Sequence, residues 1–432
     1  MKRKSKIFDL SAISIVACDS IQCALLIFID LFFVSNVLKD VNYDISYKII
    51  QIGLFYIIYY GVLGTSYLFT GYYLKNHNKS VFVSIGAFGF TAVVVLIYFL
   101  RDNLVTFLPI IALLYGLSFS FYSPGYHNLT SETISSKHQV RFFAIKRIVV
   151  QLVYVLFPVV FGLIDEHINF SVVIIIMAVL CVALVVFSFL IKPKKVFKLS
   201  FNLRKYGRYL KDHKQSAEPL KFVYLSNFFR GASVDCFTTL LTILVWIGAQ
   251  STSTLGTLQS VFTLVSIITL FLYLRYYRKK RSKTFLFPCF ILVAISAISI
   301  ILTEGTNMVA ITIFYAVYTI LNVIYISLSD SRKASVVRIL SLHSHILEST
   351  AFMELSLAGG RVFSSLLLVL AGLFDGLIGT NLNIFLLVTV GIVGVLYIFF
   401  GLSLYWIERS LIRQDDQFHK MHVNELYEKV ED

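Results

Sequence analysis

Apolar stretches of about 20 residues recur along the whole chain and are separated by short polar segments. A helix of that length can cross the roughly 30 Å hydrocarbon core of a bilayer. The connections are short except for two segments, 192–221 and 329–354. The pattern predicts twelve transmembrane helices, at 10–38, 47–74, 81–100, 104–126, 146–164, 168–191, 222–249, 255–274, 284–303, 308–328, 355–378 and 383–406. The expected fold class is therefore an all-α polytopic membrane protein.

The longest connection lies near the middle of the chain and leaves six predicted helices on either side. Two short echoes link the halves: "DSIQC" in the first helix resembles "ASVDC" in the seventh, and "FGLID" in the fifth resembles "AGLFD" in the eleventh. Such repeats suit a transporter whose site lies between the repeats. We expect two pseudo-symmetric six-helix bundles, arranged as an N-terminal bundle at 1–191, a basic cytoplasmic linker at 192–221, a C-terminal bundle at 222–406 and a cytoplasmic tail at 407–432.

Composition and charge support this assignment and orient it. The chain has 432 residues, 57% hydrophobic and only 14% charged, with a mean hydropathy of +0.80, whereas soluble domains carry about 25% charged residues. Of the 38 lysines and arginines, 33 fall on one side of the predicted membrane and three on the other. The positive-inside rule then places both termini in the cytoplasm. We expect an integral protein of a bacterial plasma membrane.

The net charge of +14 does not indicate nucleic-acid binding, because the basic residues occupy short loops rather than one face of a soluble domain. The five cysteines show no paired spacing, and "HSHILE" at 343–348 lacks the spacing of a helical zinc site. We therefore expect no metal, no cofactor and no nucleic-acid partner. The expected partners are membrane lipids and a small-molecule substrate, and we expect a monomer.

The first predicted helix carries polar residues inside an otherwise apolar run. Asp19 and Asp30 are eleven residues apart, which places them about 20° from alignment on one helical face. Gln22 follows Asp19 by one turn and joins the same stripe. Because intramembrane charges normally face the bundle interior or a wet cavity, these residues are candidates for a substrate or proton pathway. The alternative for both acids is a structural hydrogen bond to a neighbouring helix.

Two helices of the second half also carry charges. Arg230 and Asp235 in the seventh helix lie about 140° apart, so they should reach different partners, and Arg230 is a candidate counter-ion for Asp19. The alternative is that Arg230 snorkels towards lipid headgroups. Glu354 and Arg361 share one face two turns apart. They are candidates for binding a zwitterion, relaying a proton or latching a gate, unless Glu354 is an ordinary acid at the start of a helix.

Aromatic and small residues give weaker signals. Aromatic residues make up 15% of the chain, and a minority with inward phenolic hydroxyls could grip an amphipathic ligand. The candidates for an aromatic cavity lining are Tyr56, Tyr115, Tyr122 and Tyr318. Gly53 and Gly64 lie on one face of the second helix, where small residues allow close helix packing.

At this level of detail the chain resembles the major facilitator superfamily over essentially its whole length. The resemblance rests on the six-plus-six layout, the basic central loop and "YGLSFSFYSPGYHNLTSE" at 115–132. Pro158 and Gly162 in "FPVVFG" fall where the family often has a Gly-Pro-x-x-Gly-Gly stretch, and "MELSLAGGRV" at 353–362 is similar to a segment of some bacterial members of unassigned substrate. The resemblance implies the twelve-helix fold and marks Pro158 and Gly162 as packing positions.

The chain also departs from the family's motifs. The loop "GYYLKNHNKSV" keeps Gly71 and Lys79 of the family's gating motif but has Lys75 where an aspartate is usual. Ala112 occupies the position where proton-coupled drug antiporters carry an arginine. The resemblance therefore implies the fold more strongly than it implies drug/proton antiport.

Together these patterns predict a secondary active transporter, not an enzyme, that moves a small organic solute by alternating access. Coupling to protons is a hypothesis, because burial favours the neutral form of a carboxyl and an occluded acid could carry a proton. The aromatic content favours export of amphipathic compounds slightly, although the direction is undecided. A lipid or glycolipid flippase on the same fold and a non-transporting membrane sensor are the alternatives.

Overall fold

The computed structural model describes residues 10–74, 79–134, 139–192, 201–212, 218–276, 307–339, 345–378 and 382–431, together with Leu292, Ile295 and Ile298. Within these ranges the chain is helical and has no strand. Ten stretches are long and apolar enough to cross a membrane, and one of them, Lys79–Thr130, contains two successive helices. The predicted all-α polytopic membrane fold is therefore confirmed. Eleven of the twelve predicted spans correspond to described helices, and the ninth, at 284–303, lies almost wholly outside the described residues.

The first half of the chain contributes six spans. Asn169 begins the sixth span by accepting a hydrogen bond from the Ser171 backbone N–H, as an N-cap residue does. The elements of the first half are α1 (Leu10–Ile27), the π-helical η1 (Phe28–Phe33), α2 (Val34–Lys39), α3 (Ile45–Leu74), α4 (Lys79–Leu100), the 3₁₀ turn η2 (Arg101–Asn103), α5 (Leu104–Thr133), α6 (Gln139–His167) and α7 (Phe170–Leu190).

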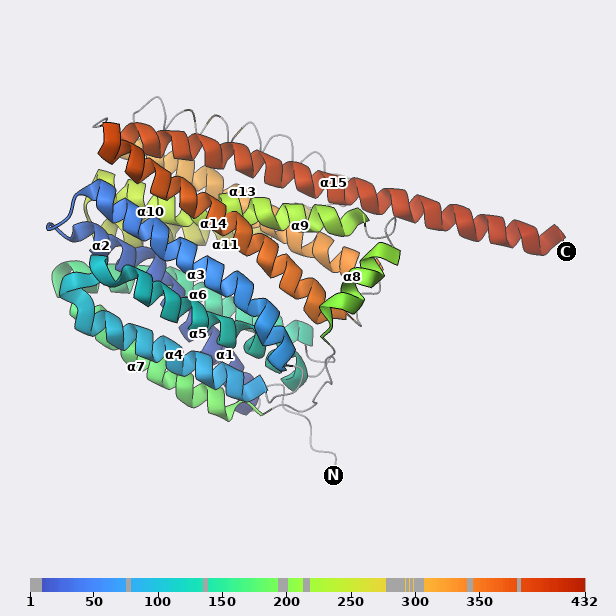
Figure 1. Cartoon of the computed structure of the whole chain (residues 1–432), viewed down its shortest axis with the longest axis horizontal. Coiled ribbons are helices and arrows are strands. Elements are labelled where there is room, and N and C mark those ends of the chain that lie inside the picture. Colours follow the sequence, from blue (N-terminus) through green and yellow to red (C-terminus); the bar gives the residue numbers. More distant parts are fainter. Residues whose placement is uncertain are drawn as a thin grey trace.

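The second half begins after a short linker helix, and its first span again contains a π-helical segment. Its elements are the linker helix α8 (Leu203–Asp212), α9 (Glu218–Arg230), the π-helical η3 (Gly231–Asp235), α10 (Cys236–Ala249), α11 (Thr252–Tyr276), α13 (Met308–Ile339), α14 (Ile346–Ile378) and α15 (Leu382–Glu431). Helix α15 continues through the segment predicted as a tail and extends beyond the other helices (Figure 1).

The two halves lie side by side, with the helices of the first half on one side of the molecule and those of the second half on the other (Figure 1). Helices α3 and α14 pack against each other, and so do α6 and α11. In both contacts the second span of one half meets the fifth span of the other half. The interface therefore has the pseudo-symmetry that the sequence echoes predicted.

The outer surface is apolar, as a lipid-facing surface should be. Helix α7 shows this clearly, since its exposed side chains follow one another at spacings of three and four residues and so form one stripe. In water such a stripe would be costly to expose, but in a bilayer it is in contact with acyl chains. The stripe consists of Ile175, Val179, Val182, Val186 and Phe189.

The linker helix α8 packs on the second half and not as an isolated surface element. Tyr206 is buried there, and its hydroxyl lies 2.7 Å from the Tyr224 hydroxyl on α9. The backbone N–H of Asn202 donates to the Glu348 carboxylate at the start of α14, over 2.6 Å. Burial raises the pKa of Tyr206, which keeps its phenol neutral and able to hydrogen-bond.

Candidate functional site

A cavity of about 440 Å³ lies between the two halves of the chain. Helices α1, η1, α3, α5 and α6 of the first half supply one wall, and α9, α10, α11 and α14 of the second half supply the other. Six polar residues singled out in the sequence line it, and they come from both halves. These residues are Asp19, Gln22, Asp30, Arg230, Glu354 and Arg361. The seventh, Asp235, ends η3, and its side chain lies outside the described residues.

Asp19 forms an ion pair with a lysine of the fifth span. The Lys146 Nζ lies 3.1 Å from the Asp19 Oδ2, and both side chains are mostly buried. The same ammonium group lies 5.0 Å from the centroid of the Tyr126 ring. Lys146 therefore supplies the positive charge that stabilises the carboxylate at this depth.

The prediction that Arg230 is the counter-ion of Asp19 is wrong. The Arg230 Nη1 lies 3.2 Å from the Asp330 Oδ1 on α13, within the same half of the chain. Arg230 does line the cavity, but its guanidinium is turned towards α13. Asp19 and Arg230 are thus each paired with a residue of their own half.

Asp30 lies in the π-helical segment η1 and accepts a 2.9 Å hydrogen bond from the Tyr56 hydroxyl of α3. Single π-helical turns are frequent at functional sites, because the extra residue redirects side chains. Here the turn lets Asp30 reach both the cavity surface and a buried tyrosine. The hydrogen bond to Tyr56 supports a structural role for Asp30, and its place on the cavity surface supports a role in a substrate or proton pathway.

The wall formed by the second half carries both an acid and a guanidinium group on α14. The Arg361 guanidinium lies 4.9 Å from the centroid of the Tyr60 ring, at cation–π distance across the two halves. Glu354, two turns earlier on α14, lines the same cavity. Close by on the opposite wall lie His127 and Tyr67, and the Tyr67 hydroxyl hydrogen-bonds with Ser123 over 2.8 Å.

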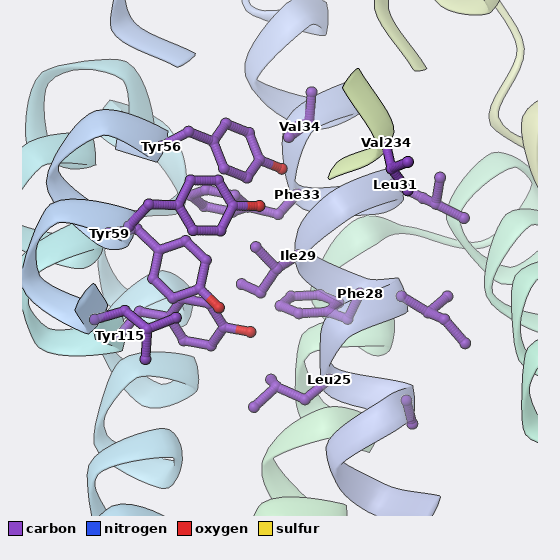
Figure 2. Close-up of a cluster of buried hydrophobic side chains, with 14 of the residues drawn as sticks. Leu25, Phe28, Ile29, Leu31, Phe33, Val34, Tyr56, Tyr59, Tyr115 and Val234 are labelled. Atoms are coloured by element: carbon purple, nitrogen blue, oxygen red, sulfur yellow. The ribbon is translucent and has the colours of Figure 1, made fainter. Parts of the chain in front are cut away.

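The aromatic lining of the cavity differs from the one predicted. Tyr56, Tyr115 and Tyr122 are fully buried behind the wall, and Figure 2 shows Tyr56 and Tyr115 packed towards the π-helical segment η1. Tyr318 lies in the second half, where its hydroxyl donates to the Val234 carbonyl over 3.0 Å. The reason is helical register, since neighbouring aromatic residues on the same helices take the inward positions. The aromatic side chains on the cavity surface are Tyr59, Tyr60, Tyr67, Phe119 and Tyr154.

The small residues lie where the halves touch. A Cβ on Gly64 would meet the Ala358 Cβ at 2.5 Å, and one on Gly53 would meet the Val369 Cγ2 at 2.6 Å, so both glycines permit close approach of α3 and α14. On the other side of the interface, a Cβ on Gly162 would lie 2.8 Å from the Thr252 carbonyl oxygen.

The other positions singled out by the family resemblance lie at a helix–helix interface or at helix ends. The Pro158 carbonyl oxygen of α6 lies directly against Gly256 of α11, at the same interface. Gly71 lies in the last turn of α3, and Lys79 begins α4 and is buried. Lys75 lies outside the described residues. Their role in gating stays a prediction.

Polar contacts gather at the end of the bundle opposite the chain termini. The Lys39 Nζ lies 2.6 Å from the Asp165 Oδ2 and 5.7 Å from the centroid of the Trp246 ring in the other half. Glu166 of α6 accepts hydrogen bonds from the Ser251 hydroxyl and the Ser253 backbone N–H at the start of α11, over 2.7 and 2.8 Å. These contacts tie the halves together at this end, and the sequence analysis did not identify them.

The chain belongs to the major facilitator superfamily, whose family model matches residues 22–346. Fold, cavity and family together define a membrane transport protein, and they support a secondary transporter. A comparison with curated protein sequences found no match.

Solved structures of transporters share the fold at low sequence identity. The nucleoside transporter NupG aligns with a TM-score of 0.59 at 15% identity, covering 93% of this chain and 99% of that one. The POT family transporter PepTSo gives a TM-score of 0.65 at 11% identity, with 92% and 98% covered. The human organic anion transporter MFSD10 gives 0.58 at 11% identity, with 92% and 99% covered. At such identities the likeness shows the fold alone.

Proposed function

We propose that this protein is a secondary active transporter that moves a small, charged organic solute by alternating access. The observation that carries the proposal is the convergence of Asp19, Asp30 and Glu354 with Arg230 and Arg361 on one cavity between the halves. Intramembrane charges are costly unless they line a wet pathway or bind a ligand. Acids, guanidinium groups and aromatic rings on one surface suit a solute with a charged group and an apolar part.

The Glu166 hydrogen bonds to Ser251 and Ser253 hold the halves together at the end opposite the termini. They support the proposal that this end is closed in this state and that solute enters and leaves the cavity from the terminal end. Asp19 lies in the first third of the continuous span Leu10–Lys39, and Glu354 lies in the first third of α14, so both are on the terminal side of the middle of their spans. His127 lies near the end of α5, at the same level. Rocking of the halves about the α3–α14 and α6–α11 contacts would open the opposite end.

Proton coupling through Asp19 is part of the proposal. Protonation of Asp19 would remove its attraction to Lys146 and free that ammonium for a negatively charged group of the solute. A proton and a solute anion would then use the same site in turn. For the direction of transport we propose a slight preference for export, because the aromatic side chains on the cavity surface suit an amphipathic solute. No observation on the described residues favours a lipid flippase or a sensor over a transporter.

The experiment uses purified protein in proteoliposomes. A thermal-shift screen against sugars, amino acids, drugs and lipid-linked glycans supplies the solute, and its transport is measured with and without an imposed pH gradient. We expect Asp19→Asn to abolish the response to the pH gradient while solute exchange at equal pH continues. Asp102→Asn is the matched control, because that acid lies at an exposed loop position outside the cavity. Unchanged gradient-driven transport in Asp19→Asn would refute the coupling.

A further inference from the structure

A second, smaller chamber of about 120 Å³ adjoins the central cavity within the second half. Its walls come from α10, α11 and α13. Thr238 and Gln259 line both chambers, so they mark the boundary between them. The smaller chamber contributes nothing to the charged site described above.

The lining of this chamber is polar but uncharged. Eight of its ten lining residues carry a hydroxyl or an amide, and none carries a formal charge. This differs from the central cavity, where five charged residues meet. Hydroxyls and amides both donate and accept hydrogen bonds, which is the pattern that recognises hydroxyl groups of a ligand. The polar members include Thr263, Ser266, Tyr315, Thr319 and Asn322.

Two details indicate a site for a ligand rather than simple packing. The Asn322 Oδ1 is buried and has no hydrogen-bond partner among the described residues, and such a group is costly unless something donates to it. The rings of Phe262 and Tyr315 lie with centroids 4.2 Å apart and form an aromatic wall on the chamber. The Tyr315 hydroxyl contacts the Gln259 side-chain oxygen, which fixes the residue at the boundary.

We infer that this chamber is a binding subsite for an uncharged, hydroxyl-rich part of the transported solute, such as a sugar ring. The inference rests on the proposed transport function and narrows its substrate class. The charged part of the solute would bind in the central cavity, and the hydroxyl-rich part would pass Thr238 and Gln259 into the chamber. There its hydroxyls would meet the amide and hydroxyl groups, and its apolar face would lie on the aromatic wall.

The test compares pairs of six-membered-ring probes that carry the same charged group, one rich in hydroxyl groups and the other without any. Binding of glucosamine is compared with binding of cyclohexylamine, and glucuronate with cyclohexanecarboxylate, on the purified full-length protein in nanodiscs by calorimetry. The variants are Thr319→Val and Asn322→Leu, which remove hydrogen-bonding groups at little change in size. Thr312→Val is the control, because Thr312 lies on the same helix, outside the chamber.

We expect at least one hydroxylated probe to bind about tenfold or more tightly than its partner, since unmatched polar groups penalise the deoxygenated probe. Each chamber variant should reduce this preference by several-fold, and Thr312→Val should leave it unchanged. Absence of a preference in both probe pairs, or a preference that survives both chamber variants, would overturn the inference. A clear preference without any uptake into proteoliposomes would instead refute the transport function and leave a binding subsite.

Discussion

At the scale of single residues, the polar face of the first helix was readable from the sequence, but its partners were not. Asp19, Gln22 and Asp30 all line the cavity, as their helical spacing predicted. His127 and Lys146 were missed because His127 follows the predicted span 104–126 and Lys146 is the very first residue of the predicted span 146–164. Helix α5 continues to Thr133 and α6 begins at Gln139, so both residues are helical and reach the interior. Hydropathy marks where a span is apolar, not where its helix ends.

The Asp19–Lys146 pair gives a prediction at this scale. Lys146→Met should lower the thermal stability of the protein, because the mostly buried Asp19 side chain then loses the ammonium group that lies 3.1 Å from it. We expect a loss of about 1–3 kcal/mol, the usual cost of a buried polar group without its partner. The double variant Asp19→Asn/Lys146→Met should be more stable than Lys146→Met alone. Losses that simply add in the double variant would contradict a direct pairing.

At the scale of elements, both halves begin with a span that contains a π-helical segment, η1 in one and η3 in the other. Apolar periodicity could not predict these segments, because a one-residue insertion within a span leaves no trace in hydropathy. The close packing of α3 on α14 was within reach of the sequence, since the Gly53 and Gly64 stripe indicated one tight interface. The partner helix was not, because a glycine stripe does not specify what it meets.

The α3–α14 interface offers a matched pair of glycine variants. Gly64→Ala would place a Cβ 2.5 Å from the Ala358 Cβ, whereas a Cβ on Gly61 would meet no atom within 4 Å. We expect Gly64→Ala to destabilise the protein by about 1–3 kcal/mol through overpacking and to slow transport. Gly61→Ala on the same helix should change neither. Both are measured by thermal unfolding and proteoliposome uptake, and equal behaviour of the two variants would argue against a tight interface at Gly64.

At the scale of the whole molecule, two like halves enclose a charged cavity, and the second span of each half packs against the fifth span of the other. The six-plus-six plan followed from hydropathy and charge bias, which membrane insertion imposes on the sequence, and from the short echoes of an internal repeat. The residues that line the cavity could be predicted from the sequence only in part. Which aromatic ring faces inward depends on the rotation of each helix against its neighbours, and a single sequence records that rotation weakly.

The central claim is that the seam between the halves is a wet cavity reached from the side of the termini. Its most direct measurement is labelling of Gln22→Cys, in a cysteine-free background, by a membrane-impermeant thiol reagent in inside-out and right-side-out vesicles. Val95→Cys, on an apolar outer surface, is the control. We predict that Gln22→Cys reacts about tenfold or more faster in inside-out vesicles and that Val95→Cys reacts in neither. A Gln22→Cys protein as unreactive as Val95→Cys from both sides would contradict the account.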